Sequence, residues 1–160
     1  MAIFNQYIFK ALENKFLYYN SIREAVKEAR VEQLEGHFGV TGGNNSGHSK
    51  ISDPTAAAGI KRATPLKFVK ILHDGSELVI YNPEAWLQIM NRTYAAFDGT
   101  TVDRAMARRY EGAALEKIIS DFHISTKTFY NWRSDFLTYA AVQAVSEGLI
   151  KLNQGEVKQI

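Results

Sequence analysis

The feature that most constrains the fold is the stretch of residues 112–133, GAALEKIISDFHISTKTFYNWR, because two helical periodicities meet there across a short connection. Apolar residues recur in its first half at the three-and-four spacing that places them on one helix face: Leu115, Ile118, Ile119 and Phe122. Ser125 lies where its hydroxyl can cap a second helix that begins at about Thr126. The inward face of that helix is predicted to carry Phe129, Trp132 and Phe136. Two helices, 113–121 and one from 126 onward, are therefore expected to pack against each other.

The outward side of the second helix is polar or basic and is the candidate DNA contact. Its candidate residues, with the cap and the boundary positions, are Ser125, Thr126, Lys127, Thr128, Tyr130, Asn131, Arg133 and Ser134. In a helix that lies in the major groove, Asn pairs bidentately with adenine, and Lys binds guanine or phosphate. The pattern predicts a helix-turn-helix that binds duplex DNA. An ordinary amphipathic helical hairpin is the alternative.

A helix predicted over residues 102–110 adds three arginines just before this stretch: Arg104, Arg108 and Arg109. Arg104 and Arg108 are four residues apart and share a face, from which they can reach backbone phosphates. Salt bridges with Asp103 or Glu111 explain these arginines equally well.

The run SDFHISTKTFYNWRSDFL resembles the C-terminal signature of phage-encoded late-gene transcriptional activators of the RinA/ArpU type. A second stretch, Ser52-Asp53-Pro54-Thr55, resembles a segment that such proteins carry after an N-terminal helix. The resemblance implies a sigma-like helix-turn-helix and a sequence-specific activator of phage or prophage late operons. It also implies that the protein has no catalytic site and no cofactor.

Length and composition limit the other classes of function. A chain of 160 residues, 46% of them hydrophobic, can bury one core with a small satellite. The formal charge of +2 permits nucleic-acid binding without requiring it. The absence of cysteine excludes disulfides, thiol catalysis and Cys-ligated zinc. No apolar run reaches the length of a membrane span and no signal peptide is recognisable, so no membrane association and a cytoplasmic location are expected.

The N-terminal region, residues 1–35, is predicted to form one long helix or two helices joined near Tyr19-Asn20-Ser21. The buried face of its first part is expected to carry Ile3, Tyr7, Ile8, Ala11, Leu12 and Phe16. Aromatic rings are more numerous here than one face can hold: Phe4, Tyr7, Phe9, Phe16, Tyr18 and Tyr19. They either cover another part of the same chain or contact a partner, such as RNA polymerase or a second copy.

Residues 36–52 are rich in Gly, Asn and Ser and are predicted to be a flexible loop. They lack the Gly-Lys-Ser/Thr ending of a nucleotide-binding loop. His37 and His48 lack further ligands at metal-binding spacing, so no metal site is expected. A short predicted helix, residues 53–63, begins a helical domain of residues 53–150.

A small β-hairpin is predicted over residues 66–81, within this helical domain, and continuation of a helix through residues 66–72 is the alternative. Two runs of β-branched and aromatic residues flank Asp74-Gly75, a strong hairpin turn signal. Proline and an acidic first turn then predict a helix over residues 83–96.

The second helix of the 112–133 stretch is predicted to continue to Glu147, where Gly148 stops it. Its small residues, Ala140, Ala141 and Ala144, allow close approach of a helix from this chain or from a second copy. From Leu149 onward the chain is predicted to be a polar tail, assigned to residues 151–160.

The predicted fold class is mostly α, multi-helical, with a C-terminal helix-turn-helix and a small central β-hairpin. The predicted function is that of a DNA-binding transcriptional regulator, with duplex DNA as its partner and RNA polymerase or a homodimer mate as further candidates. A phage terminase small subunit and a protein-interaction module that does not bind DNA are the alternatives. An enzyme is not expected, because no nucleophile elbow or paired-carboxylate motif is present.

Overall fold

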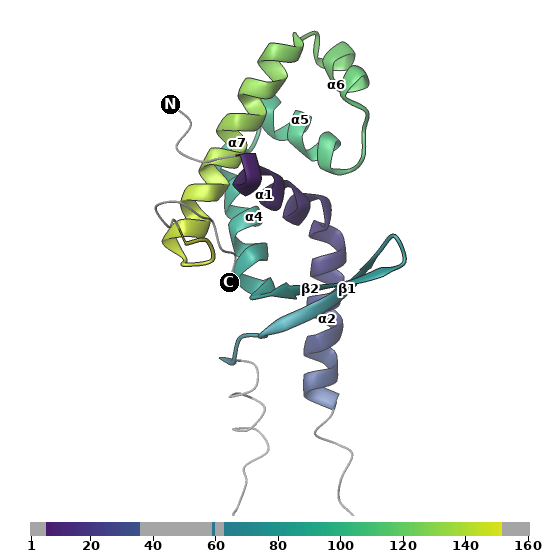
Figure 1. The fold of residues 1–160 in the computed structure, drawn as a ribbon, viewed down its shortest axis with the longest axis vertical. Coiled ribbons are helices and arrows are strands. Elements are labelled where there is room, and N and C mark those ends of the chain that lie inside the picture. Colours follow the sequence, from purple (N-terminus) through teal and green to yellow (C-terminus); the bar gives the residue numbers. More distant parts are fainter. Residues whose placement is uncertain (1–5, 36–58, 60–62, 152–160) are drawn as a thin grey trace, which may run out of the picture. The chain divides into compact units, whose positions relative to one another are not determined.

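The computed structural model describes residues 6–35, 59 and 63–151. Within these residues the protein is mostly helical, with a two-stranded antiparallel sheet in the middle of the chain (Figure 1), which confirms the predicted helical content and the hairpin. The elements are α1 (Gln6–Leu17), α2 (Tyr19–Glu35), β1 (Phe68–His73), β2 (Ser76–Tyr81), α4 (Pro83–Phe97), α5 (Thr101–Tyr110), α6 (Leu115–Phe122) and α7 (Thr126–Ser146). The predicted loop 36–52, most of the predicted helix 53–63 and residues 152–160 lie outside the described residues.

The described chain divides into two compact units. One contains the described residues of 1–20 and 85–160, and the other lies within 21–84. Helix α1 belongs to the first unit because it packs on α7, which lies more than a hundred residues away in the chain, as the crossing of these two helices in Figure 1 shows.

An aromatic cluster forms the core of the first unit, with Phe136 of α7 at its centre. The ring centroid of Phe136 lies 5.0 Å from that of Phe16, 5.3 Å from Tyr94 and 5.3 Å from Phe97. The same helix buries its small residues Ala140, Ala141 and Ala144 completely. The sequence predicted that these alanines allow close approach of a helix from this chain or from a second copy. In the structure, other residues of this chain cover them.

The N-terminal helices are two, as one of the alternatives predicted, and they are separated at Tyr18. Their buried stripe is narrower than expected. Ile8, Leu12 and Phe16 are buried at a strict spacing of four, whereas Tyr7 is 80% exposed. The prediction for Tyr7 was wrong because its position lies one residue, about 100° of helix rotation, off that stripe.

The end of α7 corrects the predicted tail. Gly148, with a φ of 71°, reverses the chain as predicted, and the N–H groups of Leu149 and Ile150 both donate to the carbonyl oxygen of Ala144. Such a helix end folds the following apolar residues back onto the helix. Leu149 and Ile150 are therefore buried rather than part of a polar tail.

The second unit contains the hairpin. Asp74 and Gly75 have φ values of 49° and 75°, the positive values that a two-residue hairpin turn requires. Pairing aligns Phe68 with Tyr81 and Val69 with Ile80. One face buries Val69, Ile71 and Ile80, while the opposite face, called here the outer hairpin face, exposes Phe68, Leu72, Val79 and Tyr81.

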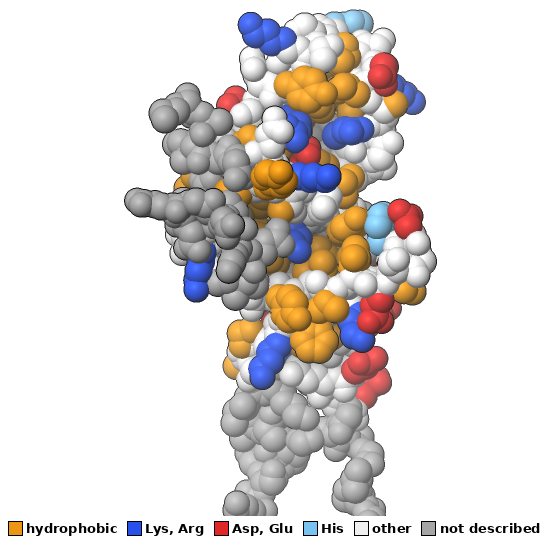
Figure 2. All heavy atoms as spheres, viewed as in Figure 1, with side chains coloured by type: hydrophobic (Ala, Val, Ile, Leu, Met, Phe, Trp, Pro, Cys, Tyr) orange, Lys and Arg blue, Asp and Glu red, His pale blue; other side chains and the backbone are white. Residues whose placement is uncertain are grey.

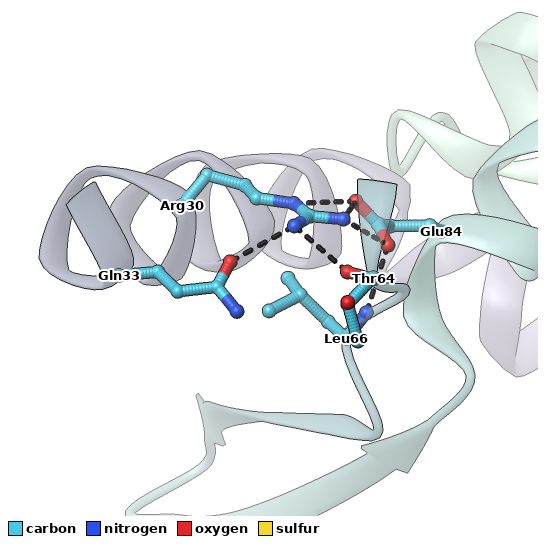
Figure 3. A network of polar contacts seen from close by, with 5 residues as sticks. All are labelled: Arg30, Gln33, Thr64, Leu66 and Glu84. Carbon is cyan, nitrogen blue, oxygen red and sulfur yellow. Dashed lines mark hydrogen bonds and ion pairs between the residues drawn. The ribbon is translucent and has the colours of Figure 1, made fainter. Parts of the chain in front are cut away.

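A polar network ties α2 to the segment before β1 (Figure 3). The Arg30 guanidinium donates to both carboxylate oxygens of Glu84, with distances of 2.6 to 2.8 Å. It also donates to the carbonyl oxygen of Thr64, and the Glu84 carboxylate accepts from the N–H of Leu66. The network places the start of the hairpin relative to α2 within this unit.

Candidate nucleic-acid interface

The connection between α6 and α7 is short and has a defined backbone geometry. His123 adopts the left-handed conformation, with φ 51° and ψ 45°, and the N–H of Ile124 donates to the carbonyl oxygen of Ile119 at 3.1 Å. Ser125 Oγ then accepts from the N–H of Thr128 at 3.1 Å, which confirms the predicted cap. The carbonyls of Ile119 and Ser120 and the N–H of Thr128 are thus bonded within the connection, which holds the two helices in one arrangement.

The inward faces of the two helices follow the prediction in part. Ile118 and Phe129 are fully buried, and the other apolar residues of α6 are half-buried. Phe136 is buried among rings of α1, α4 and α5. Trp132 is half-buried, like the apolar residues of α6 other than Ile118, so it packs inward only in part.

The outward face of the first turns of α7 is polar and accessible. Thr126, Lys127 and Asn131 are exposed and the side chain of Tyr130 is 50% exposed. Their helical positions fall within about 140° of one another, so they form one surface. The first turn of α7 contains no acidic residue, and the partial positive charge of a helix N-terminus favours a phosphate there. We call these four residues the α7 face.

Of the remaining polar candidates, Ser134 lies on the same side of α7 one turn beyond Tyr130, whereas Ser125 and Thr128 lie outside this surface. Ser125 is exposed, and its hydroxyl lies 2.9 Å from the hydroxyl of Thr128. Thr128 and Ser134 are half-buried. Ser125 and Thr128 are thus engaged in capping the helix, which leaves their hydroxyls less free to contact a ligand.

Arg133 forms an ion pair with Glu13, a residue of the same unit. Its guanidinium binds the Glu13 carboxylate of α1 through two hydrogen bonds, and the distance from Nη2 to Oε2 is 2.7 Å. Both side chains are about three-quarters buried. The hydrogen bond with Glu13 raises the pKa of Arg133, so this residue stays charged. Arg133 therefore does not lie free on the α7 face.

The three arginines of α5 differ in their contacts. Arg108 pairs with Asp121 at 2.7 Å and lies over the Phe122 ring, so its partner is in α6 and is neither Asp103 nor Glu111. The prediction missed Asp121 because α5 and α6 pack side by side. Arg109 is exposed and donates to the carbonyl oxygen of Ala113 at 3.2 Å. Arg104 is exposed.

A groove lies beside the α7 face. It has a volume of about 450 Å³ and is lined by residues of α1, α5, α6 and α7: Gln6, Phe9, Lys10, Glu13, Arg109, Leu115, Phe129, Tyr130 and Arg133. Figure 2 shows Lys and Arg side chains over this end of the unit, where α1, α5, α6 and the start of α7 lie in Figure 1. Its α1 residues, at positions 6, 9, 10 and 13, share a helix face, a signal in the sequence that the prediction did not use.

Tyr110 of α5 is buried, and its hydroxyl has no hydrogen-bond partner within the part of the chain that the structure describes. Burial raises the pKa of this phenol, and the negative charge of Glu13 adds to the effect. The hydroxyl therefore stays protonated.

No group of three or more His, Asp or Glu side chains among the described residues could hold a metal ion. Within the same residues, no helix is long and apolar enough to span a membrane. Comparisons with models of protein families, with curated proteins and with solved structures found no match. Functional inference therefore depends on the geometry of the chain itself.

Proposed function

We propose that this protein is a sequence-specific regulator of transcription that binds duplex DNA through a helix-turn-helix formed by α6 and α7. One observation carries the proposal: the capped start of α7 presents Thr126, Lys127, Tyr130 and Asn131 on one accessible surface without an acidic residue in its first turn. The short, internally bonded connection to α6 supports it, because a recognition helix must be held rigidly by its neighbour.

In this proposal α7 lies in the major groove with its N-terminal turns against the base edges. Asn131 pairs with an adenine, and Lys127 binds a guanine or a phosphate. Each good bidentate contact discriminates against a wrong base by about 1–3 kcal/mol. The exposed Arg104 contacts backbone phosphates, which position the protein without reading sequence. The mechanism is recognition without chemistry.

The resemblance of residues 120–137 to phage late-gene activators makes the proposal more specific. The protein would activate phage or prophage late genes in the cytoplasm, bound to its operator as a monomer or a homodimer and in contact with host RNA polymerase. A dimer suits a small half-site interface, because linking two sites multiplies affinity.

The test is selection of duplexes from a random library by the purified protein, followed by affinity measurements at two salt concentrations. Selected duplexes should bind more tightly than random ones, binding should weaken as salt rises, and the Lys127→Ala/Asn131→Ala variant should lose the preference. DNA binding by a ring-shaped assembly would favour the terminase small subunit instead. If the protein binds all duplexes with the same affinity, and salt does not change that affinity, the proposal is wrong. A protein-interaction module is then favoured, for which the outer hairpin face offers exposed apolar side chains.

A further inference from the structure

We propose that the groove between α1 and the start of α7 holds the sugar-phosphate backbone of bound DNA, with Lys10 and Arg109 as its phosphate contacts. This inference rests on the proposed function and extends the interface from the helix-turn-helix to the N-terminal helix. It adds residues of α1 that the sequence pattern did not bring to the site.

The charge of the groove supports this occupant. Three cations line it, Lys10 from α1, Arg109 from α5 and Arg133 from α7, against a single carboxylate, that of Glu13. The Glu13 carboxylate already binds Arg133 through two hydrogen bonds. Lys10 and Arg109 are left as exposed positive charges, and neither forms an ion pair with another described residue. A polyanion that follows the groove would meet both.

The position of the groove supports it as well. Tyr130 belongs both to the α7 face and to the lining of the groove, so the two surfaces are continuous. When the first turns of α7 enter the major groove of DNA, the flanking backbone must pass the residues at the edge of that face. On this side, those residues are the ones that line the groove.

Through its ion pair with Arg133, Glu13 weakens phosphate binding in the groove. The pair holds the Arg133 guanidinium against α1, and the Glu13 carboxylate competes with any phosphate for that guanidinium. Glu13 also repels phosphates that come near it. Replacing this carboxylate by the neutral amide of Gln should therefore strengthen DNA binding while it keeps the shape of the side chain.

The experiment measures the affinity of the full chain for a selected duplex and for a random duplex over a range of salt concentrations. Lys10→Ala and Arg109→Ala should each weaken binding to both duplexes on the order of tenfold and reduce the slope of log affinity against log salt by about 0.9. A loss shared by both duplexes identifies a phosphate contact rather than a base contact. Glu13→Gln should raise affinity for both duplexes several-fold.

Lys27→Ala is the matched control. Lys27 is an exposed lysine of α2 in the other unit, so this variant removes the same charge without touching the groove. Its affinity and salt slope should stay close to those of the unaltered protein. Circular dichroism should show that all four variants remain folded, because Lys10, Arg109 and Lys27 are exposed and the Glu13 replacement keeps its volume.

The outcomes separate this inference from the function on which it rests. If the unaltered protein binds DNA selectively but Lys10→Ala and Arg109→Ala behave like Lys27→Ala, the groove inference is overturned and the proposed function stands. If the unaltered protein shows no salt-sensitive binding to any duplex, the proposed function falls and the inference falls with it. Unchanged or weaker binding by folded Glu13→Gln would remove the role given to Glu13.

Discussion

The α6–α7 connection and the β-hairpin are two local motifs with opposite surfaces. Each has a turn with a positive φ, at His123 in one and at Asp74 and Gly75 in the other. The α7 face presents hydroxyl, amide and ammonium groups, whereas the outer hairpin face exposes the apolar side chains of Phe68, Leu72, Val79 and Tyr81 together with one ion pair, Lys70–Glu77. Polar groups suit a hydrated polyanion, and an apolar patch suits a protein surface. Turn geometry places a surface, but the side chains on it decide what it can bind.

The largest expected effect is on the core that supports the α7 face. Phe136→Ala should lower the free energy of unfolding of the helical unit by about 3–5 kcal/mol, because it leaves a cavity among four rings. Urea denaturation followed by tryptophan fluorescence measures the change. The control Val142→Ala, at a half-exposed position on the same helix, should change it by less than about 0.5 kcal/mol. Equal effects would mean that Phe136 is not central to the core.

The second-largest effect is expected on DNA affinity, in which substitutions on the α7 face and on the outer hairpin face should differ. Lys127→Ala/Asn131→Ala should weaken binding to the selected duplex by about 2–4 kcal/mol, because two base or phosphate contacts are lost. Phe68→Ser/Leu72→Ser on the outer hairpin face should leave DNA affinity unchanged in the same titration. Loss of DNA binding in the hairpin variant instead would show that the two surfaces do not have separate roles.

Two ion pairs, one in each unit, compare the effect of burial on the stability that such a pair contributes. Arg30→Ala should destabilise the protein by about 1–3 kcal/mol, because the partly buried Glu84 carboxylate loses three hydrogen bonds. Arg92→Ala breaks a comparable but half-exposed pair with Glu147 in the helical unit and should cost less than about 1 kcal/mol. Thermal unfolding of both variants gives the comparison, and a larger loss for Arg92→Ala would contradict it.

A smaller change in the free energy of unfolding, a gain rather than a loss, is expected at Tyr110. Its buried hydroxyl has no hydrogen-bond partner among the described residues, so Tyr110→Phe removes a desolvated polar group while it keeps the ring. The free energy of unfolding should stay the same or rise by about 1 kcal/mol. A clear loss of stability in chemical denaturation would show that the hydroxyl has a partner in solution.

The smallest effect on stability is expected on the outer hairpin face. Leu72→Lys should change the free energy of unfolding by less than about 0.5 kcal/mol, because Leu72 is 78% exposed. If this face contacts a second copy, the variant should lower the apparent mass measured by light scattering at high concentration. An unchanged mass would leave the face without a role in self-association.

The elements that could be predicted from sequence are those whose causes lie within a few residues. Thr100 caps α5 through the N–H of Asp103, and Ser125 caps α7 in the same way. Gly148 ends α7 with a positive φ. The candidate residues Lys127 and Asn131 could also be placed on an exposed face, because helical spacing and the position of Phe129 suffice for that.

The contacts that could not be predicted join distant parts of the chain. The pairing of Arg133 with Glu13 spans 120 residues, and Arg108 binds Asp121 through the packing of α5 on α6. Helical spacing placed Arg133 at the boundary of two faces but could not show which side chain lies opposite it. The groove beside the α7 face could not be predicted either, because four of its lining residues come from α1, which is distant from α7 in the chain.

The sequence by itself thus determined the cap that starts α5, the cap and glycine that bound α7, the turn of the hairpin, and the outward position of Lys127 and Asn131. These features depend on backbone hydrogen bonds and caps that close within one or two turns. The tertiary structure alone decided that α1 packs on α7, that Glu13 pairs with Arg133 and that Lys10 lines the same groove as Tyr130. Burial of the aromatic cluster around Phe136 drives that packing, and it depends on how whole helices fit together rather than on local spacing.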